Sequence, residues 1–391
     1  MTIKKNTKKK PKKPKKRKPF PPFSESVWRS RILDTDPLAD EEVPVKKRIR
    51  YENELDTDPW AEMITKIEHK PVQAKTRPKA PDKSPYLEKL LKKEGIKDFA
   101  KDIRLMTRKE LLQYFSFKTK GGKINVTLLL KNLIWQTYTW IKQGKLPAID
   151  GNIRSFWYRS VKLIFSRLGF KLTGTRYTEA VYDTFVEMVT KLRLFHYADF
   201  GFVDERGHAR VTGKNNGNLI LFVEKDGLFG LVRKLALKYD ATGIALGGFP
   251  SYLTTEFFVN DLVNLGIRDN IRLFSMVDYD PSGYWIEREF TQQLKDFGLE
   301  VVSVSSLVNP DELSSELVEV CKYKLKQEAK TSNWLKITGG ISGEAFGLEA
   351  DALEYSRLKG TYEKAVEPYL KPVTKEMLGK RCSVCGALIS P

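Results

Sequence analysis

The sequence predicts an α/β protein: a helical domain followed by a parallel β-sheet that helices cover on both faces. Two features of the 391-residue chain lead to this fold class. Between residues 86 and 195, apolar residues recur at helical spacing. From residue 218 onward, short apolar strands alternate with amphipathic helices, which is the pattern of βαβ units in a parallel sheet. We therefore expect one domain over 86–217 and a second over 218–375.

The first domain is predicted to contain helices and a hairpin. The helical periodicity covers residues 86–95, 107–116, 126–144, 152–169 and 178–195. Residues 198–213, with the sequence ADFGFVDERGHARVTG, then form two short alternating runs around a turn, which predicts a β-hairpin. Short helices followed by a small hairpin indicate a winged helix, a helix-turn-helix variant that docks on DNA. The alternative is a small helical domain with an unrelated hairpin.

The second domain is predicted to be a sheet of parallel strands. Apolar strands are expected at residues 218–224, 242–248, 271–278 and 299–306, and the helices between them at 228–239, 254–266 and 283–298. Sheets of this type present their functional groups at the carboxyl ends of the strands. Polar residues at those ends are therefore the first candidates for a functional site.

Three carboxylates stand at the ends of predicted strands. Glu224 closes the first strand, Asp278 closes the third, and Asp280 follows two residues later in MVDYDPSGYWI. In an extended chain the side chains of Asp278 and Asp280 point to the same side. Because Mg²⁺ binds carboxylate oxygens and offsets the repulsion between them, the three residues predict a Mg²⁺ site. The alternative for the two aspartates is a turn with Asp280 as a helix N-cap, and Asp226 is expected to be a turn or cap residue.

Residues 1–85 are rich in Lys, Pro, Asp and Glu, and they are predicted to form a mostly disordered basic tail. Eleven basic residues and no acidic residue lie between Lys4 and Lys18, and removing them from the formal net charge of +19 leaves +8. Excess positive charge attracts polyanions, which predicts binding to double-stranded DNA. A solubilising tail or an address signal would have the same composition. The predicted DNA-binding residues are Lys4, Lys5, Lys8, Lys9, Lys10, Lys12, Lys13, Lys15, Lys16, Arg17 and Lys18.

The composition argues against several other classes of protein. No segment approaches the roughly 20 apolar residues of a membrane span, and no apolar signal region stands at the N-terminus. Three cysteines argue for a reducing compartment, so we expect an intracellular protein located with DNA. No GxxxxGK[ST] motif and no convincing Ser/His/Asp set is present. In the predicted tail 376–391, Cys382 and Cys385 form half of a zinc knuckle whose other half is missing, so no metal is predicted there.

Three segments between residues 218 and 290 resemble the motifs of one family. FVEKDGLF, LGGFPSYLTTEFF and VDYDPSGYWI are similar, in this order, to segments of the topoisomerase VI A subunits and of the meiotic double-strand-break transesterases. That family combines a winged helix with a Toprim domain, which is a Rossmann-like parallel sheet. The resemblance implies that Glu224, Asp278 and Asp280 are the Toprim ligands of Mg²⁺. It also implies that the chain is a small A-like member of this family.

The family carries a nucleophilic tyrosine upstream of the Toprim domain, in an Arg-x-x-aromatic-Tyr motif. Residues 154–158 read RSFWY, so the resemblance implies Tyr158 as the nucleophile and Arg154 as a contact of the scissile phosphate. The match has two departures, because Trp157 replaces the first of two adjacent tyrosines and Ser155 replaces an acidic residue. A core or surface aromatic in an amphipathic helix is the alternative for Tyr158, and Tyr138 and Tyr177 are the other candidates for the nucleophile.

The resemblance implies a Mg²⁺-dependent DNA-cleaving enzyme similar to the A-type component of a type IIB topoisomerase. A tyrosine attacks a backbone phosphorus and forms a 5′-phosphotyrosyl link, and a homodimer breaks both strands because each tyrosine works with the partner's carboxylates. A separate ATP-hydrolysing B-type subunit is a further expected partner, since this chain contains no recognisable ATPase motif. Two alternatives stay open: a DNA-binding architectural protein of the same fold, and a Toprim nuclease that hydrolyses DNA with water and metal.

Overall fold

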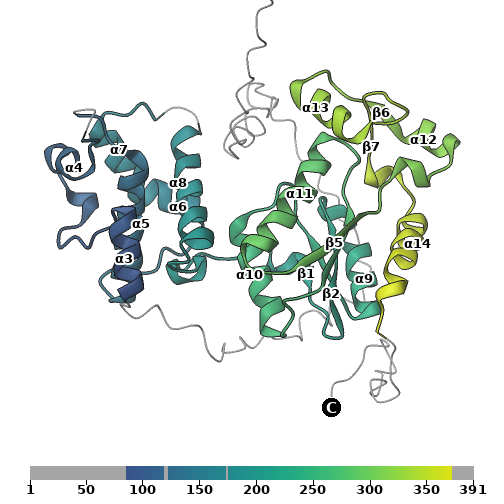
Figure 1. The fold of residues 1–391 in the computed structure, drawn as a ribbon, viewed down its shortest axis with the longest axis horizontal. Coiled ribbons are helices and arrows are strands. Elements are labelled where there is room, and N and C mark those ends of the chain that lie inside the picture. Colours follow the sequence, from purple (N-terminus) through teal and green to yellow (C-terminus); the bar gives the residue numbers. More distant parts are fainter. Residues whose placement is uncertain (1–84, 119–121, 173–174, 372–391) are drawn as a thin grey trace, which may run out of the picture.

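A computed structural model describes residues 85–118, 122–172 and 175–371. The chain folds into a helical unit, blue to teal in Figure 1, and a sheet unit, green to yellow. Nearly all of the predicted tail 1–85 and the whole of the tail 376–391 lie outside the described residues. In the described part of the chain, no helix has both the length and the apolar character that crossing a bilayer requires.

The helical unit is built from the predicted helices. Its α-helices are α3 (Pro85–Glu94), α4 (Arg108–Phe115), α5 (Val126–Lys142), α6 (Ile153–Phe156), α7 (Lys162–Leu168) and α8 (Arg176–Val186). Local sequence explains where they begin. Thr107 and Glu110 form a capping box at the start of α4, and the side chain of Asn125 accepts a hydrogen bond from the first turn of α5. Helices over all five predicted segments are thus confirmed, although 152–169 is not a single α-helix.

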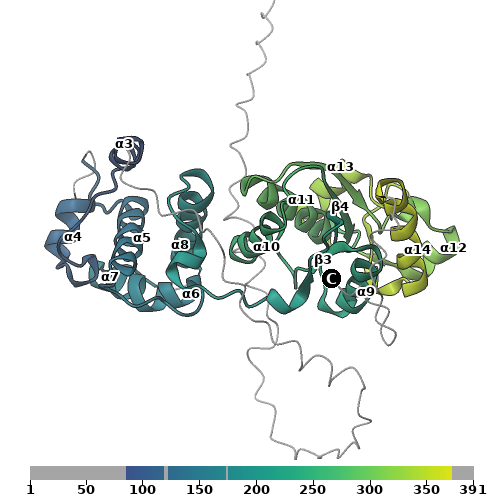
Figure 2. The ribbon, with the colours of Figure 1, turned by 90° about the horizontal axis from the view of Figure 1, so that it is seen from below.

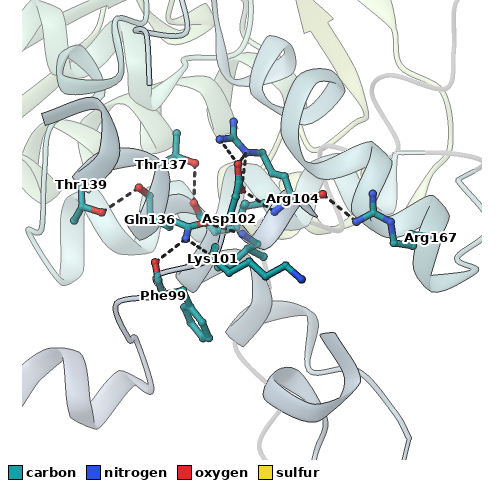
Figure 3. Close-up of polar contacts among 10 residues, drawn as sticks. Phe99, Lys101, Asp102, Arg104, Gln136, Thr137, Thr139 and Arg167 are labelled. Carbon is teal, nitrogen blue, oxygen red and sulfur yellow. Dashed lines mark hydrogen bonds and ion pairs between the residues drawn. The ribbon is translucent and has the colours of Figure 1, made fainter. Parts of the chain in front are cut away.

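The long helix α5 lies at the centre of the helical unit, and its buried polar side chains hold a neighbouring loop. The Oε1 atom of Gln136 accepts a hydrogen bond from the backbone N–H of Ile103 at 2.9 Å, while its Nε2 atom donates to two loop carbonyls (Figure 3). Arg167 of α7 donates to the carbonyl of Arg104 in the same loop at 2.9 Å. A buried amide that satisfies three backbone groups fixes this loop against α5.

The hairpin predicted for residues 198–213 is wrong. These residues instead form parts of the 3₁₀ turns η4 (Tyr197–Phe200) and η5 (Gly207–Ala209), followed by β1 (Arg210–Val211), which pairs with the central sheet. The first run is not extended because its start lies in η4, where Asp199 accepts a hydrogen bond from the backbone N–H of His196 at 2.8 Å, and Gly201, with φ of 77°, ends this turn. The segment therefore connects the two units and does not form the wing that was predicted there.

The sheet unit contains a five-stranded sheet with the strand order β1-β3-β2-β4-β5. Its parallel strands are β2 (Asn216–Val223), β3 (Ala241–Ala245), β4 (Ile271–Met276) and β5 (Val301–Ser306), and β1 pairs antiparallel with β3. The helices between the parallel strands are α9 (Phe229–Tyr239), α10 (Tyr252–Asn264) and α11 (Pro281–Asp296). The predicted α/β class, with its parallel strands and intervening helices, is confirmed.

Helices cover both faces of the sheet (Figure 1). In β2, Leu219 and Leu221 belong to the core formed with α9 and α14 (Tyr355–Val366), whereas Ile220 and Phe222 belong to the core formed with α10 and α11. Strand side chains alternate between the faces with a period of two, so a strand that is apolar at every position is buried on both sides. Strand ends are therefore the places where polar side chains of the apolar strand β2 can reach solvent or a ligand.

The residues beyond β5 fold back to the carboxyl end of β4. They comprise α12 (Ser315–Cys321), β6 (Lys322–Lys324), α13 (Ala329–Thr338), β7 (Phe346–Leu348) and α14, and β6 pairs antiparallel with β7. Tyr279 and Leu348 exchange two backbone hydrogen bonds of 2.8 and 3.1 Å. This exchange brings the residues after β7 next to Asp278. None of these elements was predicted from the sequence.

The helical and sheet units contact each other through α10 (Figure 2). Tyr252 and Leu253, at the start of α10, belong to the hydrophobic core of the helical unit. The buried carboxylate of Glu256 accepts a hydrogen bond from the backbone N–H of Tyr197 at 2.7 Å and lies 2.9 Å from Nδ1 of His196. Apolar packing and a buried polar contact thus join the two units.

Gly283, in the first turn of α11, is required by the close approach of this helix to Asp278. A Cβ atom at position 283 would lie 2.0 Å from the carbonyl oxygen of Asp278, whereas a Cβ atom at Gly227 would meet nothing within 4 Å. We expect Gly283→Ala to lower the free energy of unfolding by about 2 to 3 kcal/mol, because the backbone has to shift. Chemical denaturation measures this, with Gly227→Ala as the matched control. Equal stabilities of the two variants would contradict the expectation.

Candidate active site

The three predicted carboxylates lie at the carboxyl edge of the sheet. β2 ends just before Glu224 and the neighbouring strand β4 ends two residues before Asp278. Burial of Glu224, together with the negative charges of Asp278 and Asp280, raises the pKa of its carboxyl to about 7. Its Oε2 atom is buried and has no hydrogen-bond partner. The structure therefore brings all three predicted residues into one electrostatically coupled cluster.

Asp280 is also the N-cap of α11, which was the alternative for this residue. Its Oδ1 atom accepts a hydrogen bond from the backbone N–H of Gly283 at 2.7 Å, and Pro281 occupies the first helical position. Its Oδ2 atom accepts a hydrogen bond from the hydroxyl of Tyr323 at 2.9 Å. Burial of that hydroxyl, together with the charge of Asp280, raises the pKa of Tyr323. Capping fixes the position of Asp280 and does not remove it from the acidic cluster.

Lys225, which was not predicted as a site residue, lies within this cluster. Its Nζ atom is 3.1 Å from Oδ2 of Asp278, 3.3 Å from Oδ2 of Asp351 and 3.8 Å from Oε2 of Glu349. The backbone N–H of Ala350 donates to Oδ1 of Asp278 at 2.9 Å, across 72 positions of sequence. Because of this long separation, local sequence motifs do not indicate that Glu349 and Asp351 lie near Asp278. The one local signal for Lys225 is its place directly after Glu224.

The chemistry of the cluster fits a hard divalent cation. Mg²⁺ prefers oxygen ligands and binds through a few carboxylates while keeping several waters. Glu224 offers an unpartnered buried oxygen, and Asp278 and Asp280 lie beside it. As they stand, the described residues contain no group of three or more His, Cys, Asp or Glu side chains arranged to hold a metal ion. In this arrangement the ammonium group of Lys225 lies 3.1 Å from Oδ2 of Asp278.

Tyr158 lies in the helical unit, on a π-helical turn. This turn, η2 (Trp157–Val161), connects α6 with α7, and π-helical turns are frequent at functional sites. The side chain of Tyr158 is 46% exposed, whereas that of Trp157 is buried in the core. The core part of the alternative therefore fits Trp157 and not Tyr158, whereas a surface aromatic stays an alternative for Tyr158.

Two cations flank the phenol of Tyr158. A hydrogen bond from Arg154 and the charge of its guanidinium lower the pKa of Tyr158, and the charge of Lys162 acts in the same direction. The Cζ atom of Arg154 lies 5.9 Å from the ring centre, and the Nζ atom of Lys162 lies 5.0 Å from it. The three residues are spaced four positions apart and share the exposed face of the helix. A phenol with a lowered pKa is a better nucleophile near neutral pH.

We expect Arg154→Gln to raise the pKa of Tyr158, because the phenolate then loses its main positive partner. Titration of phenolate absorbance, taken as the difference between each variant and its Tyr158→Phe counterpart, isolates this one residue. Arg159→Gln is the matched control, since Arg159 donates to the carbonyl of Ile149 at 2.6 Å and does not shift the pKa of Tyr158. An unchanged titration of Tyr158 in Arg154→Gln would argue against the pair.

Arg206 connects the loop after β3, which contains Gly247 and Gly248, with Asp226, which follows the carboxyl end of β2. Its guanidinium forms an ion pair with Asp226 and donates to the carbonyl of Ala245 at 3.1 Å. Gly247 has φ of 67°, a left-handed conformation that favours glycine, and a Cβ atom there would displace the guanidinium of Arg206. Asp226 begins the 3₁₀ turn η6 (Asp226–Leu228) and binds an arginine rather than capping a helix with its side chain. Arg206 and Gly247 also line a cleft of about 260 Å³ between the units.

The predicted site residues thus form two groups on different units (Figure 1). Arg154 and Tyr158 lie on the helical unit, and Glu224, Asp278 and Asp280 lie at the carboxyl edge of the sheet. The basic residues of the tail, together with Cys382 and Cys385, fall outside the described residues.

Comparisons with known proteins assign no family to the chain. No protein-family model matches it, and no curated protein matches it at a significant level.

Proposed function

We propose that the chain is a DNA-cleaving transesterase similar to the topoisomerase VI A subunits, with Tyr158 as its nucleophile and Glu224, Asp278 and Asp280 as its Mg²⁺ ligands. The observation that carries the proposal is the exposed phenol of Tyr158 paired with Arg154. A guanidinium that lowers the pKa of a phenol raises the fraction of nucleophilic phenolate near neutral pH. The acidic cluster supports the proposal because functional groups of such sheets lie at the carboxyl ends of the strands.

In the proposed reaction, the Oη atom of Tyr158 attacks a backbone phosphorus of DNA. A bond forms between Oη and phosphorus, and the bond from phosphorus to the 3′ oxygen breaks. The phenol gives up its proton and the departing 3′ oxygen takes up a proton, so the products are a 5′-phosphotyrosyl link and a free 3′ hydroxyl. Arg154 stabilises the phenolate before attack, and its guanidinium matches the oxygens of a phosphate group.

Glu224, Asp278 and Asp280 would hold Mg²⁺ at the carboxyl edge of the sheet. When bound, Mg²⁺ stabilises negative charge that develops on a phosphate group. The protein keeps the carboxylates in place without it: Asp280 is fixed by the first turn of α11, and Asp278 by the backbone N–H of Ala350. The unpartnered Oε2 atom of Glu224 is an acceptor for which no protein donor competes.

The assembly that we propose is a homodimer on double-stranded DNA. Tyr158 of one protomer would serve the carboxylates of its partner, which agrees with the location of the two groups on different units. The helical unit would bind DNA as a winged-helix domain, and the sheet unit would be a Toprim domain. The basic residues between Lys4 and Lys18 would add nonspecific affinity. A B-type ATPase would be a separate chain, and the protein would be located with DNA inside the cell.

An assay for covalent adducts tests the proposal. The full-length protein is incubated with duplex DNA and Mg²⁺, the reaction is stopped with detergent, and the modified peptide is mapped by mass spectrometry. We expect DNA joined through its 5′ end to Tyr158. Cutting without an adduct would instead support a hydrolytic Toprim nuclease, and DNA binding without any cutting would support an architectural protein. Either of these outcomes contradicts the proposal.

A further inference from the structure

The position of Lys225 raises the question of how a cation could enter the acidic cluster. Its Nζ atom lies 3.1 Å from Asp278, which is a proposed ligand of Mg²⁺. It also lies 3.3 Å from Asp351 and 3.8 Å from Glu349, which are not ligands in the proposed function. One ammonium group thus stands between a nearly buried carboxylate, 12% exposed, and two carboxylates that are about half exposed.

We propose that Lys225 is an internal counter-cation of the acidic cluster. A divalent cation displaces its ammonium group from Asp278, and the ammonium group then stays on Glu349 and Asp351. This inference rests on the proposed function, because it concerns how the same site takes up its cation. It assigns Lys225 as a positioning and gating residue, and Glu349 and Asp351 as the place to which its charge is moved.

Backbone hydrogen bonds hold Glu349 and Asp351 close to Asp278. Tyr279 and Leu348 pair through two hydrogen bonds, and the N–H of Ala350 donates to Oδ1 of Asp278 at 2.9 Å. The segment that carries Glu349 and Asp351 is therefore fixed to the residue from which Lys225 has to depart. The ammonium group can change partners by rotation of its own flexible side chain, while the main chain stays in place.

The positive charge of Lys225 should have opposite effects on the cation-free and the cation-bound protein. Without a cation, Glu224, Asp278 and Asp280 repel one another in a partly buried place, and the ammonium group of Lys225 offsets part of that repulsion. With a divalent cation bound, the same ammonium group is a like charge close to the metal. Lys225 should therefore stabilise the cation-free protein and weaken cation binding. A lysine that merely held the ligands in shape would stabilise both forms.

Direct binding measurements on the full-length protein without DNA test this inference. Titration with Mg²⁺ by calorimetry, and with Mn²⁺ by electron paramagnetic resonance, gives the dissociation constants of the wild type, Lys225→Met and Lys225→Arg. We expect Lys225→Met to bind both ions about tenfold more tightly or better, because a like charge a few ångströms away has been removed. Lys225→Arg keeps the charge and should bind within about threefold of the wild type.

Thermal unfolding provides a second readout with the opposite sign. In the presence of a chelator, Lys225→Met should have a lower Tm than the wild type, and Mg²⁺ should raise its Tm by more than it raises that of the wild type. Asp351→Asn should weaken cation binding in the wild-type background by more than in the Lys225→Met background, since its part is to hold the displaced ammonium group.

The outcomes separate this inference from the proposed function. If Glu224→Gln abolishes cation binding while Lys225→Met binds equally or less tightly than the wild type, the proposed cation site stands and the role of Lys225 is overturned. If no form binds a cation in a way that depends on Glu224, the proposed site fails and the inference fails with it. Tighter binding by Lys225→Met, lost again in the Glu224→Gln double variant, supports both.

Discussion

Replacing Tyr158 with phenylalanine should abolish the covalent attachment of this protein to DNA. The substitution removes one oxygen atom from an exposed side chain and leaves the packing of the neighbouring Trp157 untouched. Loss of a nucleophile removes the covalent route altogether, so we expect adduct formation to fall by at least ~10³-fold. The measurement is the yield of detergent-stable protein–DNA adduct with duplex DNA and Mg²⁺. DNA binding, followed by fluorescence anisotropy, should change little.

Tyr177→Phe is the matched control for this prediction. It makes the same chemical change in the same unit, on a ring that packs against Phe165 and Phe170. We expect this variant to form adducts at the wild-type level. Adducts that persist in Tyr158→Phe, or that disappear in Tyr177→Phe alone, would transfer the role of nucleophile to another tyrosine.

The substitution Glu224→Gln should have opposite effects on cleavage and on stability. Removing the charge of a ligand should reduce cation-dependent cleavage by at least ~100-fold. Even mutation of residues that only hydrogen-bond to metal ligands typically lowers metal affinity or activity by roughly 10- to 100-fold. In the absence of a divalent cation, the same substitution relieves a partly buried carboxylate of its repulsion by Asp278 and Asp280. We therefore expect a variant that is less active and, in chelator, more stable.

The stability gain should depend on pH in a defined direction. The pKa of Glu224 is raised from 4.5 to about 7 in the folded protein, so the folded state binds this proton more tightly than the unfolded state does. The resulting stability is complete below about pH 4.5 and is lost as the pH rises through about 7. A shift of this size corresponds to a few kcal/mol, at most about 3. Denaturation of the wild type and of Glu224→Gln across this range, with chelator present, measures the difference.

In this experiment the two proteins should be equally stable below about pH 4.5, differ increasingly between about pH 4.5 and 7, and keep a constant difference at higher pH. Asp226→Asn is a useful comparison, because the ion pair with Arg206 lowers the pKa of Asp226 and no gain in stability is expected from its loss. A Glu224→Gln variant that is no more stable than the wild type at about pH 8 would contradict the electrostatic account of the cluster.

Much of the sheet unit could be predicted from the sequence because most of its strands are marked by a local run of apolar residues. The run from Leu219 to Val223 is apolar at every position, and such a run in a parallel sheet is buried on both faces. The carboxylates after β2 and β4 could be located for the same reason, since parallel strands end at a common edge. Prediction of the site depended on adjacency in the sheet, which the alternation of strands and helices already implies.

The parts that were missed depend on contacts between distant residues. Glu349 and Asp351 reach the cluster through the pairing of Tyr279 with Leu348, which no local pattern announces. The predicted hairpin is absent because its first run begins with the 3₁₀ turn η4, which a pattern of alternating residues does not reveal. In the sequence, Lys225 is only one residue of the segment FVEKDGLF. Whether its ammonium group belongs to the site depends on which carboxylates the fold places around it.

The π-helical turn at Trp157–Val161 changes the directions in which the side chains of its helix point around the helix axis. In a regular α-helix, successive residues four positions apart drift by about 40° around the axis, so the outer two residues of a series of three would diverge by about 80°. A wider turn winds more slowly and reduces this drift. Arg154, Tyr158 and Lys162 consequently fall closer to one line, with a cation on each side of the phenol. The four-residue spacing makes the two cations neighbours of the phenol, and the π-helical turn brings the three residues nearer to one line along the helix.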